Sequence, residues 1–321
     1  MLLFVLGGLA LFLFGINQLA EVVQSWAGEN TRYWLLKFTK NTFLAILTGI
    51  WITTLLGSSS AVIILTIILA ETRLLSVKQS LGIVLGANIG TTMSSQIIAI
   101  DIGRYAPILM IIGLIIGWIS QKSTWKKGAN TLLFLGILFF GLFVMEEGVE
   151  PLKNDKTFYE WLSKSQKPTI GTVVGAFVTL IIQSSSATVG MAIVLVKHSI
   201  LSLKGGIAIM MGAELGTVAD TLIATIGRSL RAFKVGIFHF LFNLISIITG
   251  LLLFDPFFNF VEWVSISSSP EKALANAHTL FNVLGVLLFG WTIEVAEKLG
   301  WLSERKTLHT DSLSIPESLS K

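Results

Sequence analysis

An internal repeat is the feature that most constrains this chain. Residues from about Leu9 to Ile100 align without a gap on Leu135 to Ile226, at a constant spacing of 126 residues. Chance similarity between apolar sequences gives scattered leucine and isoleucine matches, whereas here polar residues and glycines match in one register, which indicates a duplicated structural unit. The matches include Gly49 with Gly175, Thr53 with Thr179, Ser58-Ser59-Ser60 with Ser184-Ser185-Ser186, Gly86 with Gly212, and Gly90-Thr91 with Gly216-Thr217.

The composition indicates that this chain is embedded in a lipid bilayer. Of the 321 residues 53% are apolar and 13% are charged, whereas an ordinary soluble domain carries about 25% charged residues. The basic residues lie in short gaps between apolar runs and form no patch with interleaved aromatic residues, so nucleic acid is not an expected partner. We therefore predict an all-α, polytopic membrane protein in the plasma (inner) membrane.

Each copy contains two apolar segments that are too short to cross a membrane. They form the stretches 43–71 and 169–197, each interrupted by a triplet of serines. An arm of about a dozen residues rises only about 18 Å, against a hydrocarbon core of about 30 Å. We therefore predict a re-entrant helical hairpin in each copy, with its turn inside the bilayer, where non-helical backbone survives only if it is buried in protein or lines a wet cavity.

Counting the segments predicts the topology. Each copy crosses the membrane three times if its hairpin is re-entrant and five times if both arms cross. Both numbers are odd, so the second copy starts on the opposite side of the membrane. It is therefore inverted relative to the first copy, as in many secondary transporters. The first inverted repeat is then 1–125 and the second is 126–254. An extra helix over 255–297 and a short polar tail over 298–321 complete the chain.

The positively charged residues predict the orientation. Most of the 23 lysines and arginines fall on one side of the predicted spans. Because cytoplasmic loops carry the excess of positive charge, the N-terminus is expected outside and the C-terminus in the cytoplasm. The sequence is compatible with a homodimer.

The two serine triplets are the first candidate binding element. A helix that starts inside the membrane presents free N–H groups and a partial positive charge, and serine hydroxyls add donors that can rotate to meet an anion. Close helix packing is the alternative reason for serine in a membrane helix. Two such starts, brought together by an inverted repeat, predict a donor cage for phosphate or another tetrahedral oxyanion, made by Ser58, Ser59, Ser60, Gln183, Ser184, Ser185 and Ser186.

The second candidate element is a glycine–threonine segment that occurs in each copy, at 86–92 and 212–218. Two glycines four residues apart can form a helix-packing face, or they can let the helix unwind into a loop whose carbonyl oxygens bind Na⁺. An anion that enters a cell with a negative interior needs a coupled cation. We therefore predict that both segments are loops with a cation-coupling role. The predicted cation-coupling residues are Thr53, Asn88, Thr91, Thr92, Thr179, Glu214, Thr217 and Asp220, with Na⁺ as the only metal ion.

The order of these motifs resembles the type II Na⁺/phosphate cotransporter family over residues 1–297. The resemblance rests on the first serine triplet, the GANIGTT segment that starts at Gly86, the Gln183-Ser184-Ser185-Ser186 motif and the second glycine–threonine segment. Two His-x-x-Phe-Asn segments, which start at His239 and His278, add to it. The resemblance implies a symporter driven by Na⁺ that takes up inorganic phosphate by alternating access, with the serine triplets on phosphate, Na⁺ nearby and no cofactor.

Three departures from the family pattern leave alternatives open. Gly57 stands where the family has glutamine, Glu214 stands where it repeats asparagine, and Asp220 faces Ser94 across the repeat. An ionised carboxylate repels a phosphate at low dielectric, but it can also ligate Na⁺ or carry a proton. The same fold could thus carry another small anion, or couple to H⁺ through Glu214 or Asp220, or serve as a non-transporting membrane sensor or scaffold.

An enzyme is the least favoured class. The chain has no cysteine, so thiol chemistry is excluded, and its four histidines include no metal-spaced pair. A helix-facing histidine that is hydrogen-bonded to a neighbour is the favoured interpretation of His239 and His278, ahead of a proton relay.

Overall fold

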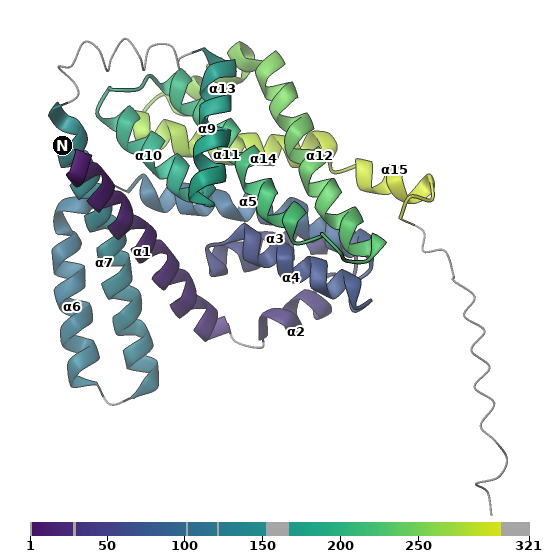
Figure 1. Ribbon diagram of the computed structural model, residues 1–321, viewed down its shortest axis with the longest axis horizontal. Helices are drawn as coiled ribbons and strands as arrows, with labels where there is room; N and C mark the ends of the chain where they lie inside the picture. Colours follow the sequence, from purple (N-terminus) through teal and green to yellow (C-terminus); the bar gives the residue numbers. More distant parts are fainter. Residues whose placement is uncertain (1, 28–29, 101, 121, 152–166, 303–321) are drawn as a thin grey trace, which may run out of the picture.

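The computed structural model describes residues 2–27, 30–100, 102–120, 122–151 and 167–302. Every regular element within these ranges is a helix, which confirms the predicted all-α class (Figure 1). The helices are α1 (Leu2–Ala27), α2 (Asn30–Lys37), α3 (Thr42–Leu56), α4 (Ser59–Glu71), α5 (Val77–Ile98), the 3₁₀ turn η1 (Gly103–Tyr105), α6 (Ala106–Ile119), α7 (Ser123–Val149), α9 (Pro168–Ile182), α10 (Ser185–Lys197), α11 (Leu203–Ile223), α12 (Leu230–Leu252), α13 (Phe254–Val264), α14 (Pro270–Phe289) and α15 (Thr292–Lys298).

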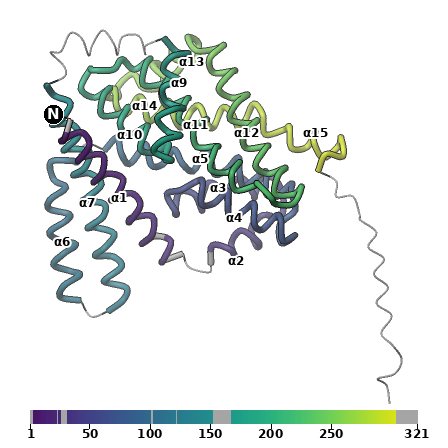
Figure 2. The backbone as a smooth tube through the Cα atoms, viewed as in Figure 1, coloured from purple at the N-terminus to yellow at the C-terminus, as the bar shows by residue number. Residues whose placement is uncertain are grey.

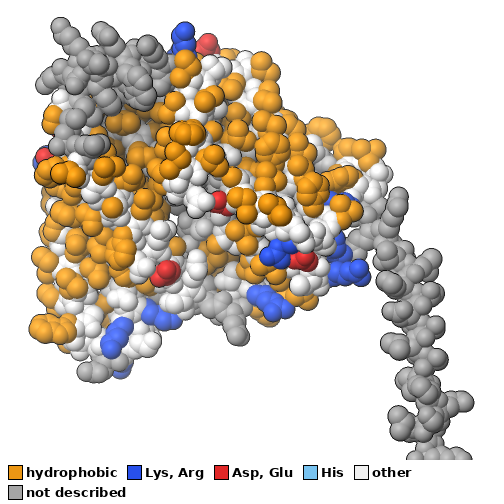
Figure 3. Space-filling view, in the orientation of Figure 1, with side chains coloured by type: hydrophobic (Ala, Val, Ile, Leu, Met, Phe, Trp, Pro, Cys, Tyr) orange, Lys and Arg blue, Asp and Glu red, His pale blue; other side chains and the backbone are white. Residues whose placement is uncertain are grey.

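Within the described residues, six stretches are long and apolar enough to cross a membrane, in α1, α5, α7, α11, α12 and the α14–α15 region. In α5 and in α11, 72% of the apolar window is buried inside the protein, so these two helices form its centre. The corresponding windows of the other four are 17% to 39% buried and present most of their apolar surface outward. Figure 3 shows hydrophobic side chains covering most of one face, with the Lys and Arg side chains near its edges. The chain is a multi-pass membrane protein.

Two helix–turn–helix units match the predicted hairpins closely. The first consists of α3 and α4, with 15 and 13 residues, and the second of α9 and α10, also with 15 and 13 residues. At 1.5 Å per residue the arms measure about 20 Å, which is shorter than a hydrocarbon core of about 30 Å. The predicted bounds, 43–71 and 169–197, agree with the structure to within one residue.

The glycine–threonine segments differ from the prediction. Residues 86–92 and 212–218 lie inside the continuous helices α5 and α11 and form no loops. The glycines permit close packing, because a Cβ on Gly86 would lie 2.0 Å from the Ile46 carbonyl oxygen and a Cβ on Gly212 would lie 1.9 Å from that of Thr172. The loop prediction was therefore wrong, and the alternative of a helix-packing face is correct.

Two hydrophobic cores hold the helices together, and each includes a helix of the other copy. One core joins α3, α4 and α5 with α12, which contributes the buried Val235 and Phe242. The other joins α10 and α11 with α7 and α1, where Phe12 of α1 is fully buried. The long contact of α1 with α7 can be followed along the tube in Figure 2. The two copies are thus interlocked and do not form separate domains.

The region after the second copy also differs from the prediction. Instead of one extra helix over 255–297 there are three helices, α13, α14 and α15. Ser269 has an extended backbone and Pro270 occupies the first turn of α14, so the chain turns and starts a new helix there. Helix α14 packs against α5, α10 and α11 and so reaches the centre of the protein.

Candidate functional site

The two hairpin turns have nearly the same backbone geometry. Ser58 and Ser184 are the N-cap residues of α4 and α10, with φ/ψ of −145°/109° and −150°/106°. The Ser58 Oγ accepts the Ala61 N–H and the Ser184 Oγ accepts the Ala187 N–H, both at 3.2 Å. An N-cap of this kind satisfies one of the four free N–H groups of a helix start. Each serine hydroxyl can still donate its own hydrogen to another acceptor.

The residue before each N-cap is in the left-handed conformation, and here the copies differ. Gly57 has φ/ψ of 64°/13° and Gln183 has 56°/31°. A residue with a Cβ costs about 1–2 kcal/mol in this conformation, whereas glycine adopts it freely. The glycine in the first copy is therefore the unstrained choice for the turn, and the second copy keeps an exposed glutamine side chain at the same place.

The remaining serines are buried or partly buried, and one of them contacts the other copy. Ser59, Ser185 and Ser186 are buried. Ser60 is partly buried, and its Oγ lies 3.4 Å from Oδ2 of Asp220 on α11. The structure therefore brings one predicted anion-binding residue against one predicted cation-coupling residue of the other copy.

The threonines and the asparagine of the glycine–threonine segments use their donors within their own helices. Thr91 Oγ1 donates to the Ala87 carbonyl and Thr217 Oγ1 to the Ala213 carbonyl, both at 3.0 Å. Thr92 Oγ1 donates to Ile89, and Asn88 Nδ2 to Val84. Their backbone carbonyls stay in helical segments, so a cation could meet only the side-chain oxygens of these residues.

Thr53 and Thr179 are a matched pair with different environments. The Thr179 Oγ1 donates to the Thr188 Oγ1 at 2.7 Å. The Thr53 Oγ1 is buried and has no hydrogen-bond partner, because Val62 stands where the second copy has Thr188. A buried hydroxyl without a partner is uncommon. Its free oxygen is a hard ligand that fits a small cation such as Na⁺.

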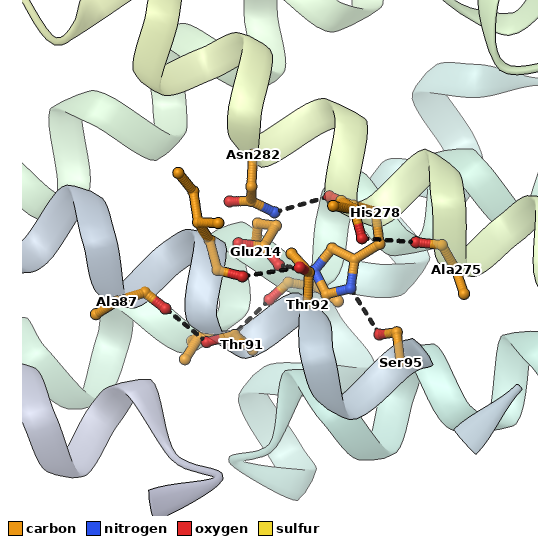
Figure 4. A network of polar contacts seen from close by, with 12 residues as sticks. Ala87, Thr91, Thr92, Ser95, Glu214, Ala275, His278 and Asn282 are labelled. Atoms are coloured by element: carbon orange, nitrogen blue, oxygen red, sulfur yellow. Dashed lines mark hydrogen bonds and ion pairs between the residues drawn. The ribbon is translucent and has the colours of Figure 1, made fainter. Parts of the chain in front are cut away.

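A buried polar cluster joins three helices in the centre of the protein (Figure 4). His278 of α14 is fully buried, and its Nε2 lies 2.7 Å from Oε1 of Glu214 on α11. Its Nδ1 lies 2.6 Å from the Ser95 Oγ on α5. The predicted hydrogen bond of this histidine to a neighbour is confirmed, but its two partners were not predicted.

A second histidine repeats part of this arrangement. His239 of α12 lies 2.8 Å from the Thr221 Oγ1 through its Nδ1, and Thr221 is the residue that matches Ser95 in the repeat. Each histidine begins a His-x-x-Phe-Asn segment, whose asparagine donates to the carbonyl of the histidine, Asn243 at 3.1 Å and Asn282 at 3.2 Å. Each histidine therefore contacts the matched hydroxyl residue of a different copy through its Nδ1, and His278 also contacts Glu214.

This sequence departs from the family pattern at Glu214, and the contact with His278 explains how a carboxyl group can be buried there. Glu214 matches Asn88 in the repeat, and its side chain is almost completely buried. A buried carboxyl group is costly unless it is hydrogen-bonded or paired. The imidazole of His278 supplies that partner, so the carboxyl group does not stand isolated in the protein.

These features define the class of the protein as a multi-pass helical membrane protein with an internal duplication. A family model described as Na⁺/Pi-cotransporter matches the chain twice, over residues 11–147 and 143–292. The chain belongs to this family of phosphate transporters, which are not enzymes.

Several curated proteins are similar to this chain. YqeW of Bacillus subtilis, an uncharacterized protein, is 29% identical over 279 residues, which are 87% of this chain and 90% of YqeW. YjbB of Salmonella typhimurium, provisionally named an inorganic phosphate export protein, is 25% identical over 287 residues, which are 89% of this chain and 52% of YjbB. This chain thus spans about half the length of YjbB.

A human relative matches a shorter part of the chain. The human sodium-dependent phosphate transport protein 2B is 30% identical over 131 residues, which are 37% of this chain and 19% of that protein. No solved structure matches the chain significantly.

Proposed function

We propose that this protein is a secondary active symporter that moves inorganic phosphate together with Na⁺ across the plasma membrane. The family and the names of YjbB and the human relative support phosphate as the substrate. The observation that carries the proposal is the pair of equal helix starts at Ser58 and Ser184, each N-capped by a serine at the turn of a short hairpin. Two such starts offer amide and hydroxyl donors to one anion.

In this proposal the two hairpins are re-entrant and the two copies are inverted. The arms of the hairpins are too short to cross the membrane in the usual way. The contacts are also exchanged between copies, since α4 packs on α11 and α10 packs on α5. Inverted repeats that meet in this way support alternating access around a central site.

The proposed anion site has two parts. Ser58, Ser59 and Ser60 belong to the first part, and Gln183 with Ser184, Ser185 and Ser186 belong to the second. The backbone of Gln183 is in a left-handed conformation that costs free energy, and such strain is typical of functional positions. We assign its amide group to the anion.

The proposed cation sites lie beside the anion site. In the first copy the free Thr53 oxygen and the side chains of Asn88, Thr91 and Thr92 are the ligands. In the second copy they are Thr179, Glu214, Thr217 and Asp220. Asp220 touches Ser60, so a Na⁺ ion at this carboxylate would offset its repulsion of a phosphate nearby.

The proposed orientation has the N-terminus outside and the C-terminus in the cytoplasm. Ion pairs between basic residues and acidic ones join neighbouring helices at the proposed cytoplasmic end, with Arg228 on Glu71 and Lys78 on Glu294. Lys197 pairs with Glu146 at the other end. Basic residues are in excess at the first end, as expected for the cytoplasmic side.

The proposal is tested by ³²P-phosphate flux in proteoliposomes of defined orientation. An inward Na⁺ gradient should drive accumulation, and an equal choline gradient should not. Vesicles preloaded with phosphate should lose it faster when the Na⁺ gradient points outward, since a symporter follows its gradient in both directions. Ser58→Ala and Ser184→Ala should each lower phosphate affinity about 10- to 100-fold, the loss of one hydrogen bond to a charged ligand. Flux that ignores the Na⁺ gradient would contradict the proposal.

Coupling to H⁺ is the second candidate, and the burial of Glu214 against His278 favours it. In this case a pH gradient without Na⁺ should drive phosphate flux. The variant Glu214→Asn restores the residue of the first copy and should abolish the pH-driven flux. If neither gradient moves phosphate in the wild-type protein, two interpretations remain: the transport of another small anion, or a non-transporting sensor or scaffold.

A further inference from the structure

We propose that a cavity between α12, α13 and α14 binds one acyl chain of a membrane lipid. The cavity has a volume of about 240 Å³. Its walls are mostly aromatic and aliphatic, and they include Phe257, Phe281 and Leu288 together with the hydroxyl-bearing Ser246 and Thr249. None of these belongs to the proposed anion and cation sites, so the inference does not rest on the proposed function.

Ser246 and Thr249 carry the side-chain hydroxyl groups of the cavity, and that of Ser246 lacks a partner. Ser246 is 5% exposed, and its Oγ is buried without a hydrogen-bond partner. Gly285 on the facing helix α14 keeps the space in front of this hydroxyl open, because a Cβ there would lie 3.2 Å from the Ser246 Oγ. A ligand that is apolar along its length and carries one acceptor, such as the ester carbonyl of a lipid chain, satisfies this hydroxyl.

The opening of the cavity faces the bilayer. Leu253 and Leu288 line it and are each about half exposed, at 52% and 51%. Asp255 at the start of α13 pairs with Lys204 at 3.1 Å, and this ion pair marks the nearby membrane surface. A ligand that enters past these leucines comes from the hydrocarbon layer and not from water.

The size of the cavity selects one chain rather than a whole lipid. Sites for drug-sized ligands begin at about 300 Å³, and this cavity is smaller. The headgroup and any second chain would stay outside, in the bilayer.

The cavity lies next to the buried cluster of Glu214 and His278. Phe281 packs edge-on against Phe257 with ring centroids 6.1 Å apart, and it follows His278 by one helical turn. A bound chain therefore supports the part of α14 that carries His278. This position gives the lipid a way to influence the centre of the protein.

The test is a titration of the full-length protein with phosphatidylglycerol, followed by native mass spectrometry. The variant Thr249→Phe places a ring in the cavity and should lose the tightest-bound lipid. The matched control is Ile248→Phe, which adds the same ring to α12 at a side chain that is 49% exposed and does not line the cavity. The control should retain the lipid with wild-type affinity.

A second variant keeps the test decisive if Thr249→Phe fails to fold. Ser246→Ala removes the hydroxyl without adding volume and should weaken lipid retention about fivefold, the change expected for one ordinary hydrogen bond. Equal retention by the wild-type protein and Thr249→Phe, or by the wild-type protein and Ser246→Ala, would overturn the inference.

Discussion

The two copies of the repeat differ in their side-chain chemistry far more than in their backbone. The units α3–α5 and α9–α11 have hairpin arms of equal length, the same N-cap geometry and equally close glycine contacts. Yet Thr53 lacks the partner that Thr179 has, and Asn88 is replaced by Glu214. Packing and capping restrict the backbone in both copies, whereas single polar positions were free to diverge.

The divergence at Glu214 changes which parts of the chain hold the centre together. Asn88 bonds a carbonyl of its own helix. Glu214 instead takes a partner from α14, which lies outside the duplication. The polar residue at this position therefore has its partner on α14 in the second copy and within its own helix in the first copy.

The largest expected effect tests the shared backbone. Gly86→Ala and Gly212→Ala each place a Cβ within 2.0 Å of a carbonyl oxygen of the packed helix. We expect both variants to destabilise the protein by about 3 kcal/mol or more, since overpacking forces backbone shifts, and to do so about equally. Thermal unfolding in detergent measures the effect. The control is Gly128→Ala on α7, where a Cβ meets nothing within 4 Å; a large effect in only one of the two copies would break the comparison.

The next effect tests the difference between the two histidines. His278→Leu leaves the buried Glu214 carboxyl group without its partner and should cost about 3 kcal/mol. His239→Leu should cost about 1 kcal/mol, because Thr221 also donates to the Val218 carbonyl. The double variant of His278→Leu with Glu214→Asn should recover most of the stability. Equal costs for the two histidine variants, measured by thermal unfolding, would show that the two copies are held alike.

A smaller effect distinguishes Thr53 from Thr179. Thr179→Val removes a hydrogen bond and should cost about 1 kcal/mol. Thr53→Val removes a hydroxyl that has no partner and should leave stability unchanged within about 0.5 kcal/mol. If Thr53 ligates Na⁺, the same variant should raise the Na⁺ concentration that half-activates phosphate flux. A stability loss in Thr53→Val as large as in Thr179→Val would contradict this view of the site.

The smallest effect concerns the ion pair between Glu71 and Arg228 at the end of α4. The hydrogen bond from Arg228 lowers the pKa of the Glu71 carboxyl group from its ordinary value of 4.5. A lowered pKa stabilises the folded state above that ordinary value, and the contribution is lost as the pH falls through the lowered pKa. Arg228→Gln should therefore lower Tm slightly at pH 7, and the difference from the wild-type protein should shrink toward pH 4. A difference that stays constant with pH would exclude this ion pair as its cause.

The sequence predicted the hairpins well because their signals are local. A short apolar stretch interrupted by a serine triplet is readable from neighbouring residues, and the predicted ends of the two helix–turn–helix units were correct to within one residue. The glycine–threonine segments misled the prediction because glycines that permit unwinding and glycines that permit close packing look the same in a sequence. Only the approach of the Ile46 carbonyl to Gly86 distinguishes them.

The central polar cluster could not be predicted because its members are far apart in the chain. Glu214 and His278 are separated by 64 residues, and Ser95 and His278 by 183. The matching His-x-x-Phe-Asn segments were visible in the sequence, but nothing local indicates which helix each one meets. The break between α13 and α14 had a local signal in Pro270 that the prediction of a single helix did not use.

The most direct test of the account asks whether both hairpin turns contact the same phosphate. Because the chain contains no cysteine, Ser58→Cys and Ser184→Cys each introduce a single thiol, which a water-soluble methanethiosulfonate reagent can modify in proteoliposomes. Phosphate added with Na⁺ should slow the modification of both thiols at similar concentrations, and sulfate should not. Protection of only one thiol, or of neither, would contradict a site shared by the two copies.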